Sequence, residues 1–324
     1  MTTIESVANA KIIDKTVTDK IIIDTPVIDY EGSGYRTDFW EGQGREYEDA
    51  VERLTLSRTV PPQGKRIAEI GAGFGRLADM YLGYDQIILF DYSRTLLQEA
   101  VQRWGHDDRF VFVAGNIYQL PLATGLLDTL VMVRVMHHLA DVPSALSQIE
   151  RVLHRRSVAV LEYANKRNLK SMARWLLKKQ SWSPLDISPI EFVELNFNFH
   201  PRWMQTQFEQ SGLICKQQLA VSHLRLPLLK RLFSAESLAR FDSHFFMLGG
   251  HFPWSPSIFV QANNPEGVVP PETNTAVDIP AALFRCPHCF SEAFVQVSAN
   301  RIQCTQCQQS YAQQAKIWDF KSPI

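Results

Sequence analysis

Short apolar runs alternate with amphipathic stretches along the middle of the chain. The apolar runs are rich in Ile, Val, Leu and Phe, as in buried strands, and the stretches between them have helical spacing. We expect strands at 66–70, 86–90, 110–114, 127–133, 158–162, 213–221 and 257–261, and helices at 75–82, 93–103, 142–153 and 200–210. This alternation predicts an α/β fold in which helices cover both faces of a parallel sheet.

The pattern is different before and after this region. Residues 1–34 are polar and weakly patterned, and their β-rich pieces KIIID and TPVID are expected to form an extended arm. Two inserts interrupt the later strands. The first begins with a basic amphipathic helix expected at 166–180, and the second is rich in Arg, Phe and Leu. We expect these inserts, about 166–200 and 223–254, to form a cap on a domain that spans 35–262.

A small cysteine-bearing module ends the chain. Residues 263–283 contain Pro, Asn and Thr and are predicted to be a linker, followed by the module at 284–324. Its CPHC and CTQC stretches form two C-x-x-C pairs, a spacing typical of a closed, structural zinc site that a small module needs in order to fold. The expected metal ligands are Cys286, Cys289, Cys304 and Cys307. The fifth cysteine, Cys215, is expected in the core.

Composition narrows the class of protein. Apolar residues make up 45% of the 324 residues, which excludes wholesale disorder, and a net charge of −1 provides no global attraction for nucleic acid. The sequence has neither an apolar run long enough to span a membrane nor a start of the signal-peptide type. We therefore expect a cytoplasmic protein without a transmembrane segment.

A glycine-rich stretch, IAEIGAGFGRLAD at 67–79, joins the first expected strand to the next helix. Such turns hold nucleotides because bare backbone N–H groups approach the ligand. Gly71, Gly73 and Gly75 are spaced G-x-G-x-G, and Arg76 stands where a dinucleotide fingerprint has its last glycine. An NAD oxidoreductase is therefore disfavoured.

With Glu69 before it, this stretch resembles motif I of class I S-adenosylmethionine (SAM) methyltransferases of type 11. Further stretches resemble later motifs of that family in order, namely IILFDYS, GNIYQLPL, LLDTLVMVRVMHHLAD and IERVLHRRSVAVLEYANK, so the resemblance covers roughly residues 60–220. It implies a Rossmann-like, doubly wound, seven-stranded sheet with SAM as the cofactor. The module at 284–324 resembles zinc ribbons fused to some methyltransferases, and the zinc-ribbon activator subunit of tRNA, rRNA and release-factor methyltransferases.

The resemblance implies a set of cofactor-binding residues. Asp91 matches the carboxylate that accepts the ribose hydroxyls, and Asn116 stands where the family usually has an Asp for the adenine amine. The full implied set is Glu69, Gly71, Gly73, Gly75, Asp91, Tyr92, Asn116, Ile117 and Arg134. The structural alternatives are a plain tight turn for the glycines, a helix-cap neighbour for Asp91 and a turn residue for Asn116.

Catalytic groups are harder to assign. Methyl transfer needs alignment and desolvation, and it needs a base only where the acceptor must lose a proton early. His137 and His138 are candidate bases, with a purely structural role as the alternative, and Arg134 is a candidate for binding an anionic acceptor. His200 is a further candidate base.

The sequence leaves several classes of methyl acceptor possible. A small or lipid-like molecule held under the cap is favoured by the aromatic residues of the second insert, which could equally form an ordinary core. An RNA or protein acceptor, docked through the basic helix and the ribbon, and a non-catalytic SAM-binding protein are the alternatives. We also expect the aromatic segment Tyr35–Tyr47 to fold over the cofactor as a lid, or else to pack on the edge of the sheet.

Overall fold

The computed structural model describes residues 25–270 and 280–324. They form one long sheet with helices on both faces, so the predicted α/β fold class is confirmed. The strands run in the spatial order β10-β11-β12-β13-β3-β2-β1-β4-β5-β9-β8. Strands β13, β3, β2, β1, β4 and β5 are mutually parallel, whereas β9 is antiparallel to both of its neighbours. KIIID lies outside the described residues, and TPVID forms no strand.

Seven strands at the centre and one edge of this sheet follow the expected Rossmann-like arrangement. They are β1 (Gly64–Ile70), β2 (Tyr84–Asp91), β3 (Phe110–Ala114), β4 (Leu127–Met132), β5 (Leu153–Ala164), β8 (Ile214–Val221) and β9 (Ser257–Asn263). The expected count of seven is wrong for the sheet as a whole, because four further strands continue it beyond β3. They are β10 (Phe294–Ser298), β11 (Arg301–Cys304), β12 (Ser310–Gln314) and β13 (Ile317–Asp319).

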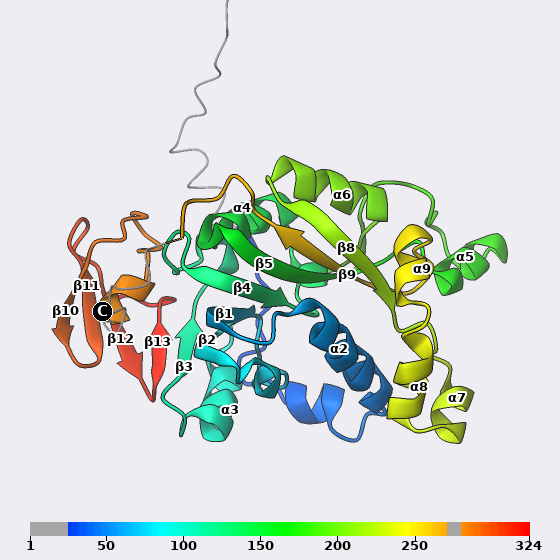
Figure 1. The fold of residues 1–324 in the computed structure, drawn as a ribbon, viewed down its shortest axis with the longest axis horizontal. Helices are drawn as coiled ribbons and strands as arrows, with labels where there is room; N and C mark the ends of the chain where they lie inside the picture. Colours follow the sequence, from blue (N-terminus) through cyan, green and yellow to red (C-terminus); the bar gives the residue numbers. More distant parts are fainter. Residues whose placement is uncertain (1–24, 271–279) are drawn as a thin grey trace, which may run out of the picture.

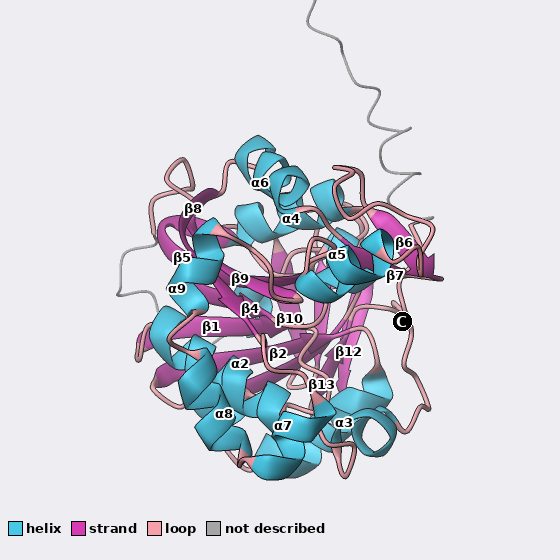
Figure 2. Cartoon of the chain, turned by 90° about the vertical axis from the view of Figure 1, so that its right-hand side faces the viewer, coloured by secondary structure: helices cyan, strands magenta, loops and turns pink. Residues whose placement is uncertain are grey.

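Helices form a layer on each side of the sheet (Figure 2). One layer contains α4 (Val142–Val152) and α6 (Pro201–Gln210), and the other contains α2 (Glu46–Thr59), α3 (Arg94–Trp104) and α8 (Ala235–Asp242). Strand side chains alternate between these layers, so the sheet separates two cores. Ile88 and Leu130 contribute to the core beneath α4, and Ile87 and Val131 to the core beneath α2.

The helix expected at 75–82 is not formed. Only a 3-10 turn, η2 (Ala78–Tyr81), follows the glycine stretch. Gly71, Gly73 and Gly75 all have positive φ, which a right-handed helix cannot include, and the chain re-enters the sheet at Tyr84. The other short helical turns are η1 (Arg36–Trp40), η3 (Ile117–Gln119), η4 (Met136–His138) and η5 (Pro280–Leu283).

The two inserts form small elements at one end of the molecule (Figure 1). The first contains α5 (Leu169–Leu176) and the hairpin of β6 (Ile190–Val193) and β7 (Asn196–Asn198). The second contains α7 (Pro227–Leu232), α8 and α9 (Phe246–His251). Helix α5 is shorter than expected, because Leu177 caps it and Lys178 adopts a positive φ of 55°. No helix among the described residues is long and apolar enough to cross a bilayer.

Candidate functional site

The glycine turn brings backbone to the carboxyl end of β1. Gly71 has a φ of 76°, and a Cβ there would lie 2.1 Å from a methyl group of Val135, so only glycine fits. Gly73 has a φ of 54° and faces open space, with Leu96 the nearest side chain. Both glycines line a pocket, so the absence of side chains there lets a ligand approach the backbone of the turn closely.

Asp91 ends β2 beside this turn. Its carboxylate accepts hydrogen bonds from the backbone N–H groups of Gly73 (2.7 Å) and Ser93 (2.9 Å). Burial raises the pKa of Asp91, while these N–H groups act in the opposite direction. The carboxylate therefore lies at the mouth of the turn, where it can accept hydroxyl groups of a ligand.

A pocket of about 90 Å³ opens between the ends of β1, β2 and β4. Of the sequence-predicted residues it contains Gly71, Gly73, Asp91, Tyr92, Ile117, Arg134 and His138. It does not contain Glu69, Gly75, Asn116 or His137.

Packing explains why three of those residues lie outside the pocket. Gly75 approaches Trp104, which donates a hydrogen bond to its carbonyl at 3.0 Å. Asn116 caps η3 by accepting from the backbone N–H of Tyr118. Glu69 is buried inside β1, and this burial raises its pKa to about 8.

The pocket is covered by the segment that precedes α2. Val27, Ile28, Tyr30 and Tyr35 all line it. The hydroxyl of Tyr30 lies 3.3 Å from Nε2 of His138. The ring centroids of Tyr30 and Tyr35 are 4.8 Å apart. The cover therefore begins at Val27, earlier than the lid expected from Tyr35. The sequence signalled these residues only through the short apolar stretch TPVID.

A network of buried charges adjoins the pocket. Glu52 on α2 is bonded to Arg134 (2.6 Å) and to Arg76 (2.5 Å), and both guanidinium groups lie over the ring of Trp40. Burial alone would lower the pKa of Arg134, but the carboxylates of Glu52 and Glu162 raise it. Glu162 also accepts from the backbone N–H of Arg134 and from the Ser257 hydroxyl. Arg134 is thus held as a cation, yet its Nη2 atom is buried and donates no hydrogen bond.

Arg225 is a third arginine of this network, and it was not identified from the sequence. Its Nε atom is buried without a hydrogen-bond partner, and its distance to Glu48 is 3.9 Å. Glu48 is closer to Lys230, at 2.7 Å. Burial lowers the pKa of Arg225, and the like charge of Arg134 lowers it further. Arg134 and Arg225 therefore each have one buried donor that no protein acceptor uses.

The two histidines differ in their surroundings. Nδ1 of His138 lies 3.0 Å from the carbonyl of Leu195, and a carbonyl can only accept, so this nitrogen carries the proton. Nε2 is then the acceptor that faces Tyr30 and the pocket. Burial lowers the pKa of both His137 and His138, which keeps both rings neutral at pH 7. Nδ1 of His137 is buried without a partner.

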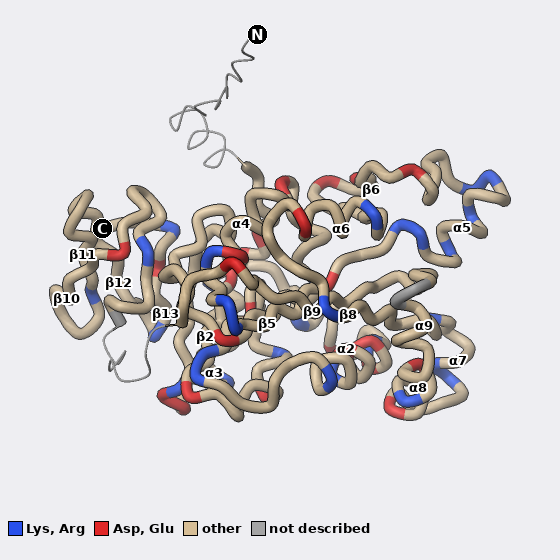
Figure 3. Tube along the Cα trace, turned by 45° about the horizontal axis from the view of Figure 1, so that its top comes forward, with Lys and Arg blue, Asp and Glu red and all other residues tan. Residues whose placement is uncertain are grey.

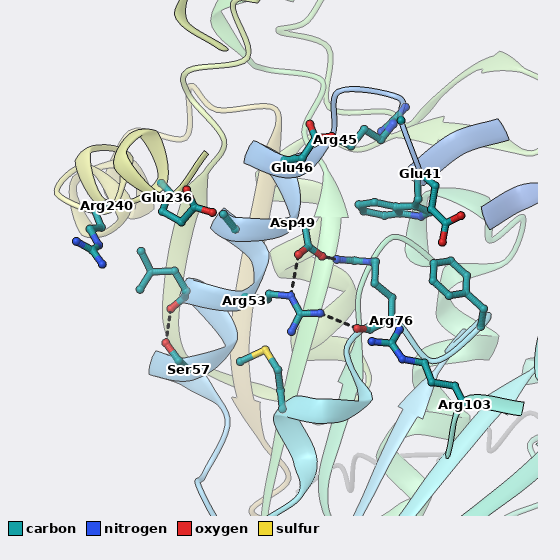
Figure 4. Close-up of a pocket in the computed structure, with 17 residues that line it drawn as sticks. Glu41, Arg45, Glu46, Asp49, Arg53, Ser57, Arg76, Arg103, Glu236 and Arg240 are labelled. Atoms are coloured by element: carbon teal, nitrogen blue, oxygen red, sulfur yellow. Dashed lines mark hydrogen bonds and ion pairs between the residues drawn. The ribbon is translucent and has the colours of Figure 1, made fainter. Parts of the chain in front are cut away.

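A larger cavity of about 820 Å³, open to solvent, lies along α2 (Figure 4). Residues of α2, the glycine turn and α8 line it, and α8 contributes Glu236, Ala239 and Arg240. Leu54 and Met80 contribute apolar surface. Charged side chains such as Asp49, Arg53 and Arg76 also line it (Figure 4). Trp40 lies between the two cavities because it lines the larger one and packs on Arg134 of the smaller one.

The four cysteines of the C-terminal module converge. Their sulfur atoms all lie within 4.8 Å of one another, with Cys286 to Cys307 at 3.6 Å and Cys289 to Cys304 at 3.5 Å. Four thiolates bound to one zinc at about 2.3 Å are separated by about 3.8 Å, so this donor set fits the metal. Cys215 does not lie in the core as expected, since it is exposed on β8.

Comparisons with known proteins agree with this geometry. Residues 68–161 match the model of a family described as a methyltransferase domain. No curated protein matches the chain. Among solved structures, a chain from a complex that contains the Haloferax volcanii Trm112 methyltransferase activator matches with 16% identity and a TM-score of 0.50, covering 72% of this chain and 98% of its own. A Listeria monocytogenes protein named as a candidate SAM-dependent methyltransferase matches with 12% identity and the same TM-score, covering 67% and 98%. At these identities the two likenesses describe the fold alone.

Proposed function

From the premise that residues 68–161 form a methyltransferase domain of the SAM-dependent class, we propose that the chain methylates a small or lipid-like acceptor that carries an acidic group. The observation that carries this proposal is a pair of arginines with unused donors: Arg134 lines the predicted cofactor pocket, and Arg225 is close enough to Arg134 for their charges to repel. The acceptor and the site residues named below are part of the proposal.

The residues of the pocket suit SAM chemically. Asp91 can accept the ribose hydroxyls, and the backbone at Gly71 and Gly73 can lie against the amino-acid part. When bound, SAM supplies a methyl group activated by a positively charged sulfur. Ligand sites of this kind measure roughly 300–1,000 Å³, so the cover from Val27 to Tyr35 must move to admit the cofactor. Glu69, Gly75 and Asn116 act through the backbone and packing in this proposal.

The acidic group of the acceptor would pair with Arg134 and Arg225. Nη2 of Arg134 and Nε of Arg225 are desolvated donors, and each gains a charge-assisted hydrogen bond from an anion. An anion also relieves the repulsion that lowers the pKa of Arg225. We assign His138 as the base where the acceptor must lose a proton, because its unprotonated Nε2 faces the pocket. His137 supports the loop.

We further propose that Cys286, Cys289, Cys304 and Cys307 bind a structural zinc and that residues 284–324 act as a built-in counterpart of a zinc-ribbon activator. The support is the pairing of β13 with β3, which extends the sheet of the domain that carries the pocket. Residues 35–262 form the catalytic domain, but its cover starts earlier, at Val27.

Cofactor binding is the first test. Calorimetry with Asp91→Ala should show SAM affinity reduced roughly 10- to 100-fold, because the ribose hydroxyls lose their acceptor in a buried site. Asp108→Ala, on the loop before β3, is the matched control and should bind normally. Unchanged affinity in Asp91→Ala would refute the assignment of the pocket.

Turnover is the second test. Radiolabelled SAM and cell extract, separated into RNA, protein, lipid and small acids, identify the acceptor class, and we expect label in lipid or small acids. With that acceptor, Arg225→Gln should raise KM roughly tenfold or more while kcat changes little, since the guanidinium binds but does not react. Arg202→Gln, on the exposed side of α6, should leave KM unchanged. Label in RNA or protein would favour the alternative acceptors, and no label would favour a non-catalytic SAM-binding protein.

A further inference from the structure

Helices α5, α7 and α9 and their neighbouring loops expose large apolar side chains on one end of the molecule, which we call the basic apolar face. On α5 and its C-cap, Leu176 and Leu177 are 70% and 65% exposed. On α7, Leu228 and Leu232 are 67% and 65% exposed. An apolar surface of this extent on a single chain marks an interaction site, because isolated leucines on a surface are common but clustered ones are not.

Direct contacts join α5 to the segment that follows α9. The backbone N–H of Leu169, at the start of α5, donates to the carbonyl of Trp254 at 2.9 Å. The rings of Trp254 and Phe252 lie 5.9 Å apart, and both side chains are at least 50% exposed. Phe252 follows α9, and α8 and α7 lie next along the same end, opposite the ribbon (Figures 1 and 2). The helices that carry the exposed apolar side chains therefore lie at the same end of the molecule.

Basic residues surround these apolar side chains. Lys170 and Arg174 are exposed on α5, and Lys178 and Lys179 follow it directly. Arg231 is exposed on α7. No acidic residue occurs between Glu162 and Asp186 or between Glu209 and Glu236. On α7, Lys230 is paired with Glu48 at 2.7 Å, so Arg231 supplies the exposed positive charge of that helix. Figure 3 shows the blue segments along α5 and α7.

We infer that the basic apolar face docks on a membrane surface that contains anionic lipids. Amphipathic helices with leucine and aromatic residues on one side and lysine or arginine on the other bind in the interface of a bilayer. Each basic residue near an anionic surface adds to the attraction, and the apolar side chains enter the boundary between headgroups and acyl chains.

An anionic membrane suits the basic apolar face better than a second copy of the chain or an RNA does. A second copy of the chain, seated on the same face, would bring two sets of lysines and arginines together. An RNA would use the charge but would leave the exposed leucines of α5 and α7 in water. Docking does not depend on the proposed function, although α8 also lines the large cavity and would place it beside the membrane.

Vesicle sedimentation with the full chain tests the inference. We expect binding at low salt to phosphatidylcholine vesicles with about one third phosphatidylserine, weak binding to phosphatidylcholine alone, and loss of binding as salt rises. Leu176→Ser with Leu177→Ser should lower the partition constant at least tenfold, and so should Lys178→Gln with Lys179→Gln. The matched control is Val295→Ser with Val297→Ser, two exposed positions on β10 of the ribbon, which should bind as the wild type does.

Three results would overturn the inference. They are no binding to the anionic vesicles, an equal loss in the β10 control, or a dimer of the wild type that the leucine variant abolishes. SAM affinity of each variant, measured without vesicles, checks that the fold is intact. It also separates a failure of docking from a failure of the proposed function, because the substituted residues lie outside the predicted cofactor pocket.

Discussion

At the scale of single residues, the pocket combines side chains at the ends of strands with side chains from segments that fold back onto the sheet. Asp91, Gly71 and Gly73 could be placed in the pocket from the sequence because each is tied to the end of a strand. Tyr30 and Arg225 could not, since their positions depend on how distant segments fold back onto the sheet. Glu69 could be recognised as part of a motif, but the motif does not reveal that its side chain is buried in the core.

Glu69 provides a test at this scale. Burial raises its pKa to about 8, well above the unfolded value near 4.3, so the folded state binds the extra proton. Its contribution to stability is therefore complete below pH ~4.3 and is lost as the pH rises through about 8. Glu69→Gln stays neutral, so its stability relative to the wild type should rise by roughly 3 kcal/mol between pH 5.5 and 8. Urea unfolding at both pH values measures this, with Glu209→Gln on the exposed side of α6 as control. A pH-independent difference would mean that Glu69 is ionised in the fold.

At the scale of elements, strands and most helices were predictable because their apolar periodicity is local. Strand β3 lies at the expected bounds, α3 is shifted by one residue at both ends, and α4 ends one residue earlier than expected. The helix after the glycine turn failed because three positive φ angles override the helical spacing of the residues that follow. The start of the cover was predicted at Tyr35 rather than Val27, because the residues before Tyr35 have little apolar periodicity.

The cover allows a kinetic prediction. With Val27, Ile28 and Tyr30 in place, the pocket of about 90 Å³ does not admit the cofactor, so binding waits for the cover to open. A chain lacking residues 1–33 should therefore bind SAM with an association rate constant at least tenfold higher than the full chain, measured by stopped-flow fluorescence. A chain lacking only residues 1–24 keeps the cover and should match the full chain. If all three chains bind at the same rate, the cover does not gate the pocket.

At the scale of the whole molecule, the ribbon is part of the sheet. The sequence predicted its cysteine cluster, because two C-x-x-C pairs are a local signal, but it also predicted a separate module on a linker. Strand β13 instead pairs in parallel with β3, and Arg94 and Asp319 form an ion pair at 2.7 Å. This docking could not be predicted, because a three-residue strand carries no pattern that selects its partner.

The ribbon also reaches the predicted cofactor pocket, and this leads to a prediction for the metal. Lys321 donates to the carbonyl of Tyr92 at 2.9 Å and lies over its ring, and Tyr92 follows Asp91 in the pocket. Cys304→Ser should therefore lose the zinc, measured by elemental analysis, and should also weaken SAM binding several-fold in calorimetry. The physical reason is that the metal holds the strands that present Asp319 and Lys321 to α3 and Tyr92.

Cys215→Ser is the matched control, because it removes an exposed thiol on β8 at the opposite edge of the sheet and should keep both metal and affinity. Hydrogen exchange in Cys304→Ser should increase along β3, where the parallel pairing with β13 is lost, and remain unchanged along β8. Full SAM affinity after loss of the metal would contradict the coupling. The ribbon would then only cover the edge of β3, and the sheet would hold the pocket without it.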